Sequence, residues 1–160
     1  MMKIVVLSDS HASLRYMRQI IDREQPDAVV HLGDYFSDGQ TMAEEYPAIL
    51  FYAVPGNCDQ FRGWISEPFT KVVTLGGVPM MLTHGHCQHV KSGLFHLLRD
   101  ARAAGVGVVL FGHTHQAYCN RENDGLWVLN PGSCGYGGGS AGIIEAENGP
   151  VLWCRLISGE

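Results

Sequence analysis

Seven side chains able to bind a metal ion follow short apolar runs in this chain of 160 residues. Five such runs each end in a carboxylate, an amide or an imidazole, often beside a glycine. Imidazole together with carboxylate suits Mn, Fe, Co, Ni or Zn, and the lack of clustered thiols argues against a soft metal. The pattern predicts a divalent metal site built from Asp9, His11, Asp34, Asn57, His84, His113 and His115.

The spacing of these side chains would suit two ions. Asp9 and His11 are two residues apart, as are His113 and His115, so one short segment can supply two ligands. Neighbouring glycines let the backbone approach closely; they are Gly33, Gly56, Gly85 and Gly112. Seven groups are enough for two ions if one carboxylate bridges them.

Each motif has an ordinary explanation when it is taken alone. Asp9 could cap a helix beside a surface histidine, and the glycine motifs before Asp34 and Asn57 are common turn sequences. Two nearby histidines, such as His113 and His115, more often just face the solvent. All of these motifs stand at the ends of apolar runs, and this joint occurrence favours a shared metal site.

The first half of the chain alternates strands with helices. Apolar runs predict strands over residues 4–7, 27–32 and 48–54. Between them we expect a short helix over 40–45 and a longer one with an apolar face of Leu14, Met17, Ile20 and Ile21. Strands that are apolar on both faces and separated by helices indicate βαβ units with a parallel sheet. In open α/β sheets the functional crevice lies at the carboxyl ends of the strands, where the seven side chains stand.

Hairpins predominate in the second half. Gly76-Gly77 separates two apolar runs, and Asp124-Gly125 and Asn148-Gly149 mark two further hairpins. A helix is expected over 91–104, ending at Gly105, with strands over 106–111 and 141–145. The glycine-rich stretch 135–139 precedes a strand, so it reads as a flexible or tightly turning loop and not as a nucleotide-binding loop. We therefore expect mixed sheets within a single α/β domain that spans residues 1–160.

Composition and charge exclude several classes of protein. The net charge of −5 argues against an extended nucleic-acid surface, although bound cations would still permit a phosphorylated substrate. No apolar run approaches the length of a membrane span. The five cysteines are scattered, odd in number and contain no C-x-x-C pair, as in a reduced protein without a disulfide framework. We expect a cytoplasmic location.

The combined motifs resemble those of the calcineurin-like metallophosphoesterase superfamily, and more narrowly its small bacterial and archaeal phosphodiesterases. The motifs are Asp9-x-His11, Gly33-Asp34, Gly56-Asn57-Cys58-Asp59, Thr83-His84-Gly85-His86 and Gly112-His113-x-His115. Asn130-Pro131-Gly132-Ser133 also matches the small branch, so the resemblance spans nearly the whole chain. It implies two mixed β-sheets packed face to face as a sandwich and flanked by helices.

The resemblance also implies a division of the ligands. One ion would be held by Asp9, His11, Asp34 and His115, and the other by Asp34, Asn57, His84 and His113, with Asp34 bridging. A metal-bound hydroxide would attack phosphorus in line, and Asn57 could also orient the phosphate of a small phosphate ester. Mn is the expected metal, with Ni, Co, Fe and Zn as alternatives.

The sequence departs from many larger members of the superfamily at Cys58. Those members carry a histidine there, which is thought to protonate the leaving oxygen. A thiol with an unperturbed pKa of about 8.5 can donate a proton but is a different acid. We expect a stricter requirement on the leaving group, which favours phosphodiesters. His86 and His89 could supply a proton or support His84, but solvated histidines are an equally good interpretation.

Other notable side chains have simple structural interpretations. His31 lies inside an apolar run and is expected to be a buried, hydrogen-bonded core histidine. Phe61, Trp64 and Phe69 are expected to cover the core, with a substrate wall or a dimer contact as alternatives. Homo-oligomer formation is therefore left open.

Two classes of function remain after these observations. The first is a phosphoesterase that uses two metal ions, and the second is a non-catalytic scaffold for protein interactions on the same fold. A metal-binding sensor is a third and weaker reading. Scaffold relatives can lose metal ligands, whereas all seven positions here carry ligating side chains, which favours the enzyme. The segment 60–69 is too short for an elaborate cap, so the natural substrate stays open.

Overall fold

The computed structural model describes residues 1–61, 66–135, 139–148 and 151–158. One sheet contains β1 (Met2–Leu7), β2 (Ala28–His31), β3 (Leu50–Ala53), β9 (Ser140–Ala146) and β10 (Val151–Ser158). The other contains β4 (Thr70–Leu75), β5 (Val78–Thr83), β6 (Val108–Leu110), β7 (Tyr118–Arg121) and β8 (Trp127–Asn130). The helices are α1 (Leu14–Glu24), α2 (Phe36–Glu45) and α3 (Phe95–Ala104). Short 3₁₀ turns cover Asn57–Phe61, His86–Gln88 and Val90–Ser92.

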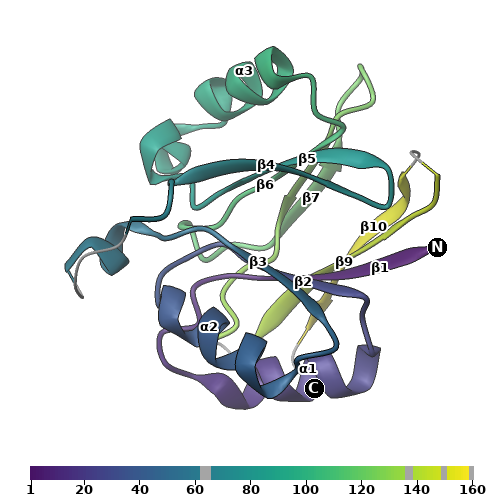
Figure 1. The fold of residues 1–160 in the computed structure, drawn as a ribbon. Coiled ribbons are helices and arrows are strands. Elements are labelled where there is room, and N and C mark those ends of the chain that lie inside the picture. Colours follow the sequence, from purple (N-terminus) through teal and green to yellow (C-terminus); the bar gives the residue numbers. More distant parts are fainter. Residues whose placement is uncertain (62–65, 136–138, 149–150, 159–160) are drawn as a thin grey trace.

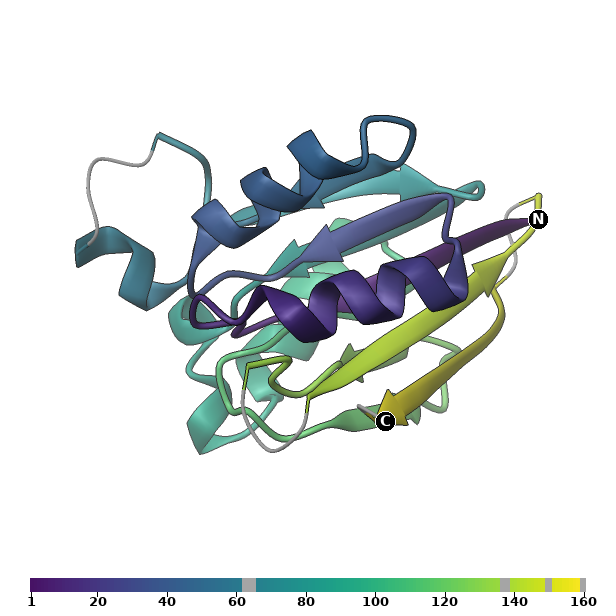
Figure 2. The same ribbon diagram turned by 90° about the horizontal axis from the view of Figure 1, so that it is seen from below.

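The two sheets pack face to face and the helices lie on their outer surfaces. In Figure 1, α1 and α2 lie below the first sheet and α3 lies above the second. Figure 2 shows α1 and α2 lying across the outer face of the first sheet. The predicted sandwich of two mixed sheets with flanking helices is confirmed.

The first sheet has the order β10-β9-β1-β2-β3. β1, β2 and β3 are parallel, with Val5 opposite Val29, and β9 runs antiparallel to β1. Both faces of β1 are buried, because Ile4 and Val6 enter the core between the sheets and Val5 packs with α1 on the other face. This double burial explains the continuous apolar run, and the predicted parallel βαβ arrangement is confirmed.

The second sheet has the order β4-β5-β6-β8-β7. β4 and β5 form the predicted hairpin, and both turn glycines, Gly76 and Gly77, have positive φ. β7 and β8 pair as the second predicted hairpin around Gly125, and β9 pairs with β10 as the third. Gly149 of the third turn and residues 136–138 of the glycine-rich loop lie outside the described residues.

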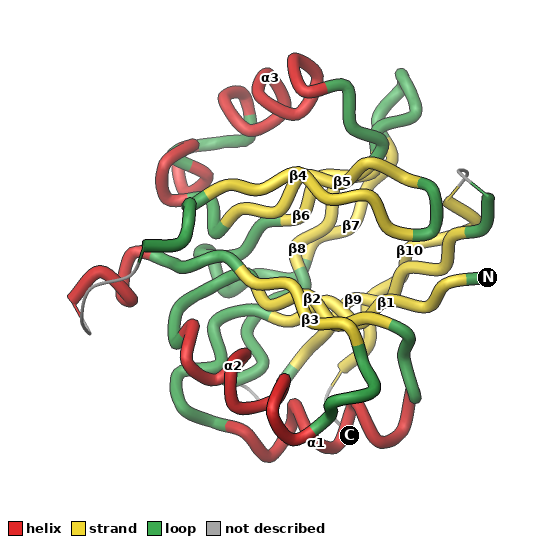
Figure 3. Tube along the Cα trace, viewed as in Figure 1, coloured by secondary structure: helices red, strands yellow, loops and turns green. Residues whose placement is uncertain are grey.

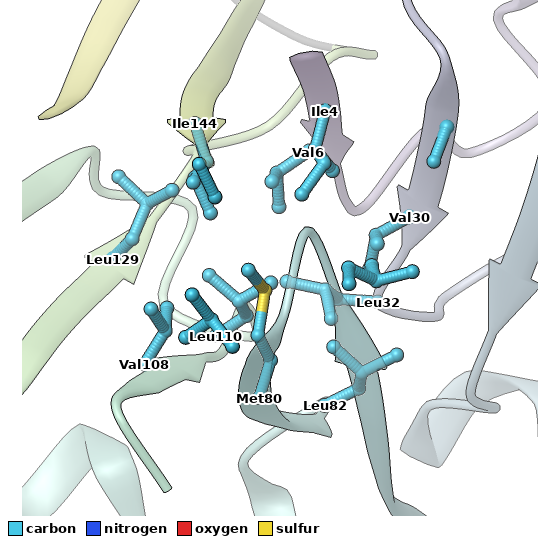
Figure 4. Close-up of a cluster of buried hydrophobic side chains, with 14 of the residues drawn as sticks. Ile4, Val6, Val30, Leu32, Met80, Leu82, Val108, Leu110, Leu129 and Ile144 are labelled. Carbon is cyan, nitrogen blue, oxygen red and sulfur yellow. The ribbon is translucent and has the colours of Figure 1, made fainter. Parts of the chain in front are cut away.

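The main core fills the space between the sheets. Figure 4 shows Val6, Leu82, Leu110 and Ile144 converging there from four different strands. Full burial of one such side chain stabilises the fold by about 1.5–3 kcal/mol. The predicted apolar face of α1 is also confirmed in large part, since Met17, Ile20 and Ile21 are buried against the first sheet and Leu14 is half-buried.

Two helices begin at other residues than predicted. α2 begins at Phe36 and not at residue 40, directly after Asp34 and Tyr35 in left-handed conformations. α3 begins at Phe95 and not at residue 91, because Gly93 has a φ of 125° that no helix allows. Gly105 ends α3 in a left-handed conformation, as predicted.

The topology brings the predicted ligands to one end of the sandwich. The loops after β1, β2, β3, β5 and β6 gather at the end opposite the N-terminus (Figure 3).

Among the described residues, every helix is too short or too polar to span a membrane. All five cysteines are free thiols.

Candidate metal centre

Six of the seven predicted ligands meet in two clusters. Within each cluster the candidate ligand atoms lie within 4.8 Å of one another. The first cluster contains Asp9, His11, Asp34 and His115, and the second contains Asp34, His84 and His113. Asp34 belongs to both clusters. Apart from Asn57, the clusters group the same side chains that the family resemblance implies for the two ions, and the role of these side chains as ligands stays a prediction.

Two buried oxygens at this end of the sandwich accept no hydrogen bond from the described residues. They are Oδ1 of Asp9 and Oδ1 of Asn57, the seventh predicted ligand. An unsatisfied buried acceptor costs about 1–3 kcal/mol, so such groups need an explanation in a folded protein. A bound cation would satisfy both oxygens, and the donor set of carboxylate, amide and imidazole fits a divalent first-row ion.

The ring nitrogens of the histidines face one another in pairs. Nε2 of His11 lies 3.4 Å from Nε2 of His115, and Nε2 of His84 lies 3.1 Å from Nδ1 of His113. Oδ1 of Asp9 lies 3.1 Å from Nε2 of His115. Neutral imidazoles bind metals through these nitrogens, so the pairs are arranged to share an ion in each cluster.

The backbone holds His84 in one tautomer. Its Nδ1–H donates to the carbonyl of Leu32 at 2.7 Å, which leaves Nε2 directed toward His113 and Asp34. A second hydrogen bond of this kind commonly orients a metal-binding histidine and raises its basicity. His84 is therefore pre-oriented as an Nε2 ligand.

The backbone of the ligand loops is unusual. Asp9, His11, Asp34, His113 and His115 all have φ between 47° and 71°, in the left-handed region. Such a conformation costs roughly 1–3 kcal/mol per residue and is found at functional sites where the surrounding structure enforces it. Asp and His tolerate it better than most residues, but nothing in the sequence analysis anticipated it.

Asp59 ties together the loops after β2 and β3. Its carboxylate is 2% exposed and accepts the backbone N–H groups of Gly56, Tyr35 and Phe36 at 2.7–2.8 Å. Three such bonds join the segment that carries Asp34 to the segment that carries Asn57. The sequence analysis recorded Asp59 only as part of a motif and missed this role.

Asn130 and Ser133 hold the loops after β6 and β1. The Asn130 amide donates to the Gly112 carbonyl and to Oγ1 of Thr114, inside the segment that carries His113. The Ser133 hydroxyl donates to the carbonyl of Asp9 at 2.8 Å. Both residues belong to the Asn-Pro-Gly-Ser motif, which therefore supports the centre from outside the ligand set.

Two hydrogen bonds orient the Asp9 carboxylate. Oδ2 accepts the Ser8 hydroxyl at 2.6 Å and the His113 N–H at 3.1 Å, while Oδ1 faces the histidines.

The close approach of the loops to one another also requires glycine beside the predicted ligands. A Cβ atom on Gly56 would lie 2.6 Å from the Asp34 nitrogen and 2.9 Å from Nδ1 of His84.

The electrostatics of the centre favour a positive charge. Burial alone would raise the pKa of Asp34, but the hydrogen bonds from His84 and the Cys58 N–H lower it well below its usual range. Burial alone would lower the pKa of His84, but Asp34 and Asp9 raise it above its usual value. Burial and the charge of His84 lower the pKa of His113 to about 4. The carboxylates thus favour a positive charge near His84, which a bound cation would supply.

Comparison with known proteins points to the same chemistry. A family model described as the calcineurin-like phosphoesterase superfamily domain matches residues 2–148. The chain belongs to this superfamily. It is a metallophosphoesterase by family, and the Asp and His clusters are its candidate metal-binding site.

Curated relatives carry matching names. The chain is 32% identical over 135 residues to the probable metallophosphoesterase YsnB of Bacillus subtilis, a match that covers 82% of this chain and 75% of that protein. It is 31% identical over 168 residues to a phosphodiesterase of Methanocaldococcus jannaschii, with 91% and 94% covered. These names support a phosphoester hydrolase.

Solved structures show the same fold. A conserved protein of Streptococcus pneumoniae, described as a predicted phosphoesterase, matches with a TM-score of 0.74 and 24% identity over 98% of this chain and 97% of that one. Vps29 of Entamoeba histolytica, solved in complex with Zn²⁺, matches with a TM-score of 0.72 and 21% identity over 99% and 100%. At this identity the likeness concerns the fold alone.

Among the predicted accessory residues of this metallophosphoesterase, His86 lies beside the second cluster. The His86 ring is 5.6 Å from the His84 ring and 6.2 Å from the His113 ring, measured between centroids. Phe69 packs edge-on against His86 at 4.9 Å, so this aromatic side chain borders the centre. Nothing is described for the side chains of Phe61 and Trp64. His89 is exposed, 6.1 Å from the ring of His96.

Cys58 lies close to Asp34, the residue that the two clusters share. Its backbone N–H donates to Oδ1 of Asp34 at 2.9 Å. Burial and the nearby Asp34 charge raise the pKa of the thiol to about 11, so Cys58 is protonated near neutral pH. His31 is fully buried and hydrogen-bonded, which confirms its interpretation as a core histidine.

Proposed function

We propose that this chain, as a single domain, is a two-metal phosphodiesterase that hydrolyses a small phosphate ester in the cytoplasm. The observation that carries the proposal is the pair of ligand clusters that share Asp34. A carboxylate between two ligand sets is the arrangement that two neighbouring ions require.

The residues divide into two ion-binding sets. Asp9, His11, Asp34 and His115 would hold one ion, and Asp34, Asn57, His84 and His113 the other. Two bound divalent ions supply Lewis acidity toward the phosphoryl oxygens and lower the pKa of water from roughly 16 toward roughly 7. Mn is our first expectation, with Ni, Co, Fe and Zn as alternatives that suit the same ligands.

The protein's own groups orient the substrate and handle the leaving group. Asn57 begins a 3₁₀ turn and lies between Gly56 and Cys58, which both approach Asp34. There its amide N–H₂ could donate to a phosphate oxygen while Oδ1 serves the ion. Cys58, next to Asp34, and His86, beside the second cluster, are the candidate proton donors. With a pKa of about 11, the Cys58 thiol is a weak acid, so it would give a poor leaving group little help. This weakness favours phosphodiesters with good leaving groups, in keeping with the name of the M. jannaschii relative.

A scaffold function is the alternative. Several fold neighbours are Vps29 proteins, and one of them, from Chaetomium thermophilum, was solved with a cyclic peptide bound (TM-score 0.66, 17% identity). This likeness supports protein binding as a use of the fold. The complete ligand set and the two unsatisfied buried oxygens support the enzyme.

Reloading metal-stripped protein separates the two proposals. Protein stripped of metal would be reloaded with Mn, Ni, Co, Fe or Zn and assayed with bis-p-nitrophenyl phosphate and p-nitrophenyl phosphate, beside an Asp34→Asn control. If the chain is a phosphodiesterase, the wild type should cleave the diester only when metal is present, and Asp34→Asn should not cleave it. Metal binding without turnover of either ester would support the scaffold instead.

A substitution at Cys58 tests the leaving-group idea. Cys58→His would replace the thiol by an imidazole, which has an unperturbed pKa of about 6.5. General acid catalysis is worth roughly 10²–10⁴-fold where the geometry is right. We expect kcat/KM for the monoester to rise relative to kcat/KM for the diester. An unchanged ratio of the two kcat/KM values would show that Cys58 does not set the preference.

A further inference from the structure

Three buried polar side chains lie behind the first ligand cluster. Ser10 stands between the ligands Asp9 and His11, His31 is the last residue of β2, and Asp38 belongs to α2. Ser10 and His31 have no exposed surface, and Asp38 is 7% exposed. We call Ser10, His31 and Asp38 the buried triad.

The hydrogen bonds of the buried triad run in one direction. The Gly33 N–H donates to Nδ1 of His31 at 3.2 Å, so the proton of the neutral ring sits on Nε2. That Nε2–H donates to Oγ of Ser10 at 2.9 Å, and the Ser10 hydroxyl donates to Oδ2 of Asp38 at 2.6 Å. The same Asp38 oxygen accepts the Ala12 N–H at 2.8 Å. Both ring nitrogens of His31, the Ser10 hydroxyl and Oδ2 of Asp38 therefore each have a hydrogen-bond partner of the right kind.

This order of partners excludes the role of a nucleophile. A nucleophilic serine gives its proton to a histidine that an aspartate orients. Here Ser10 lies in the middle, receives a hydrogen bond from His31 and is fully buried, so no substrate can reach its oxygen. The buried triad acts on the backbone around it.

The two ends of the buried triad attach to the loops that carry the first cluster. Asp38 fixes Ser10 and Ala12, so it holds His11 from both sides. His31 fixes Gly33, the residue before Asp34. Asp9, His11 and Ala12 have left-handed backbone, which persists only where neighbouring groups enforce it. α2 approaches β2 closely to deliver Asp38, since a Cβ atom on Gly39 would lie 3.2 Å from Cβ of His31.

We infer that the buried triad positions the segment of Asp9 and His11, two ligands that belong only to the first ion, the one held by Asp9, His11, Asp34 and His115. The inference rests on the proposed two-metal function. The two histidines that belong only to the second cluster are held by other groups, since the Leu32 carbonyl orients His84 and Asn130 supports the segment of His113. Breaking the buried triad should therefore weaken one of two ions and leave the other.

A pair of substitutions at Asp38 isolates the hydrogen bonds from the charge. Both bonds go to a single oxygen, so the amide oxygen of Asp38→Asn can accept them, whereas Asp38→Ala removes the acceptor. Metal-free protein would be titrated with Mn²⁺, with free Mn²⁺ followed by electron paramagnetic resonance. Ile144→Val, which removes one methyl group from the core between the sheets, controls for a general loss of stability.

We expect two Mn²⁺ ions in the wild type, in Ile144→Val and in Asp38→Asn. In Asp38→Ala one ion should keep its affinity and the other should bind roughly 10–100-fold more weakly. Equal binding by Asp38→Ala and the wild type would overturn the inference, as would equal weakening by Asp38→Asn and Asp38→Ala. If Asp38→Ala does not fold, His31→Gln and His31→Asn replace the pair. The longer Gln amide can replace Nε2 and still donate to Ser10, the contact that leads to His11, so His31→Gln should retain both ions. The shorter Asn amide can replace only the Nδ1 contact to Gly33, so His31→Asn should bind the first ion more weakly.

The same samples keep this inference separate from the proposed function. Turnover of bis-p-nitrophenyl phosphate would be recorded for each protein. A wild type that binds two ions without turnover would contradict the phosphodiesterase and leave the positioning role standing. A wild type that binds a single ion would contradict the two-metal function, and the contrast between Asp38→Ala and Asp38→Asn at that ion would still decide the role of the buried triad.

Discussion

The two ends of the sandwich use left-handed backbone in different ways. At the amino ends of β5, β6 and β8 the left-handed turns are built mainly on glycine, at Gly76, Gly77, Gly105 and Gly125. At the carboxyl ends the same backbone conformation falls on Asp9, His11, Asp34, His113 and His115. Glycine adopts this conformation without strain, whereas Asp and His do not. The difference indicates that the carboxyl end gives up stability in order to place ligands.

Adding a methyl group to one glycine at each end of the sandwich should give the largest contrast between the two ends. A Cβ atom on Gly56 would meet the Asp34 backbone and His84, and one on Gly76 would lie 2.8 Å from Cβ of Ala146. We expect Gly56→Ala and Gly76→Ala each to lower the free energy of unfolding by about 1–3 kcal/mol, measured by urea denaturation. Only Gly56→Ala should also abolish Mn²⁺ binding. If Gly76→Ala impaired binding equally, the two ends would not be independent.

Replacing a strained ligand by glycine should raise stability and weaken metal binding together. His115 is partly exposed and has a φ of 61°, so His115→Gly removes strain with little loss of packing. We expect the metal-free variant to be more stable than the wild type by up to about 1 kcal/mol, because the relief of strain exceeds the added entropy of the unfolded chain. Thermal unfolding in EDTA measures the gain, and Mn²⁺ titration measures the loss of affinity. A variant less stable than the wild type would contradict the account of strain.

The buried triad should make the free energy of unfolding depend slightly on pH. Burial lowers the pKa of His31, which outweighs the raising effect of Asp38, Asp59 and Asp9, while His84 lowers it further. The unfolded chain takes up a proton near pH 6.5 and the folded state does not, so stability is lost as the pH falls through that value. Between about pH 7.5 and about pH 6 we expect a loss of up to about 1 kcal/mol.

The variant His31→Gln isolates this contribution. We would measure the unfolding free energy of the wild type and of His31→Gln in EDTA. The difference between the two values should shrink as the pH falls below about 6.5. A difference that is independent of pH would show that His31 is protonated equally in both states.

The sequence was sufficient to predict which side chains gather at one end of the sandwich, and the family resemblance predicted the layers of the fold. Apolar runs define where each strand ends, and the side chains just beyond those ends are the ones that meet. His31 was recognisable as a core residue because it lies inside such a run. The start of α2 was not predictable, because the left-handed Tyr35 sets it through contacts with Asp59.

The supporting groups were harder to predict for a physical reason. Asp38 lies in a helix and Asp59 in a turn, where acidic residues usually face the solvent. Only the three-dimensional packing shows that each accepts buried hydrogen bonds from ligand loops. The role of Asn130 depends in the same way on segments 16–18 residues away in sequence.

The central claim is that Asp34 bridges two ions. Diffraction from crystals soaked in Mn²⁺ and measured at the Mn absorption edge tests this claim directly. We predict two anomalous peaks about 3.5–4 Å apart, with Asp34 bound to both, one beside His11 and His115 and the other beside His84 and His113. A single peak, or two peaks without Asp34 between them, would contradict the account.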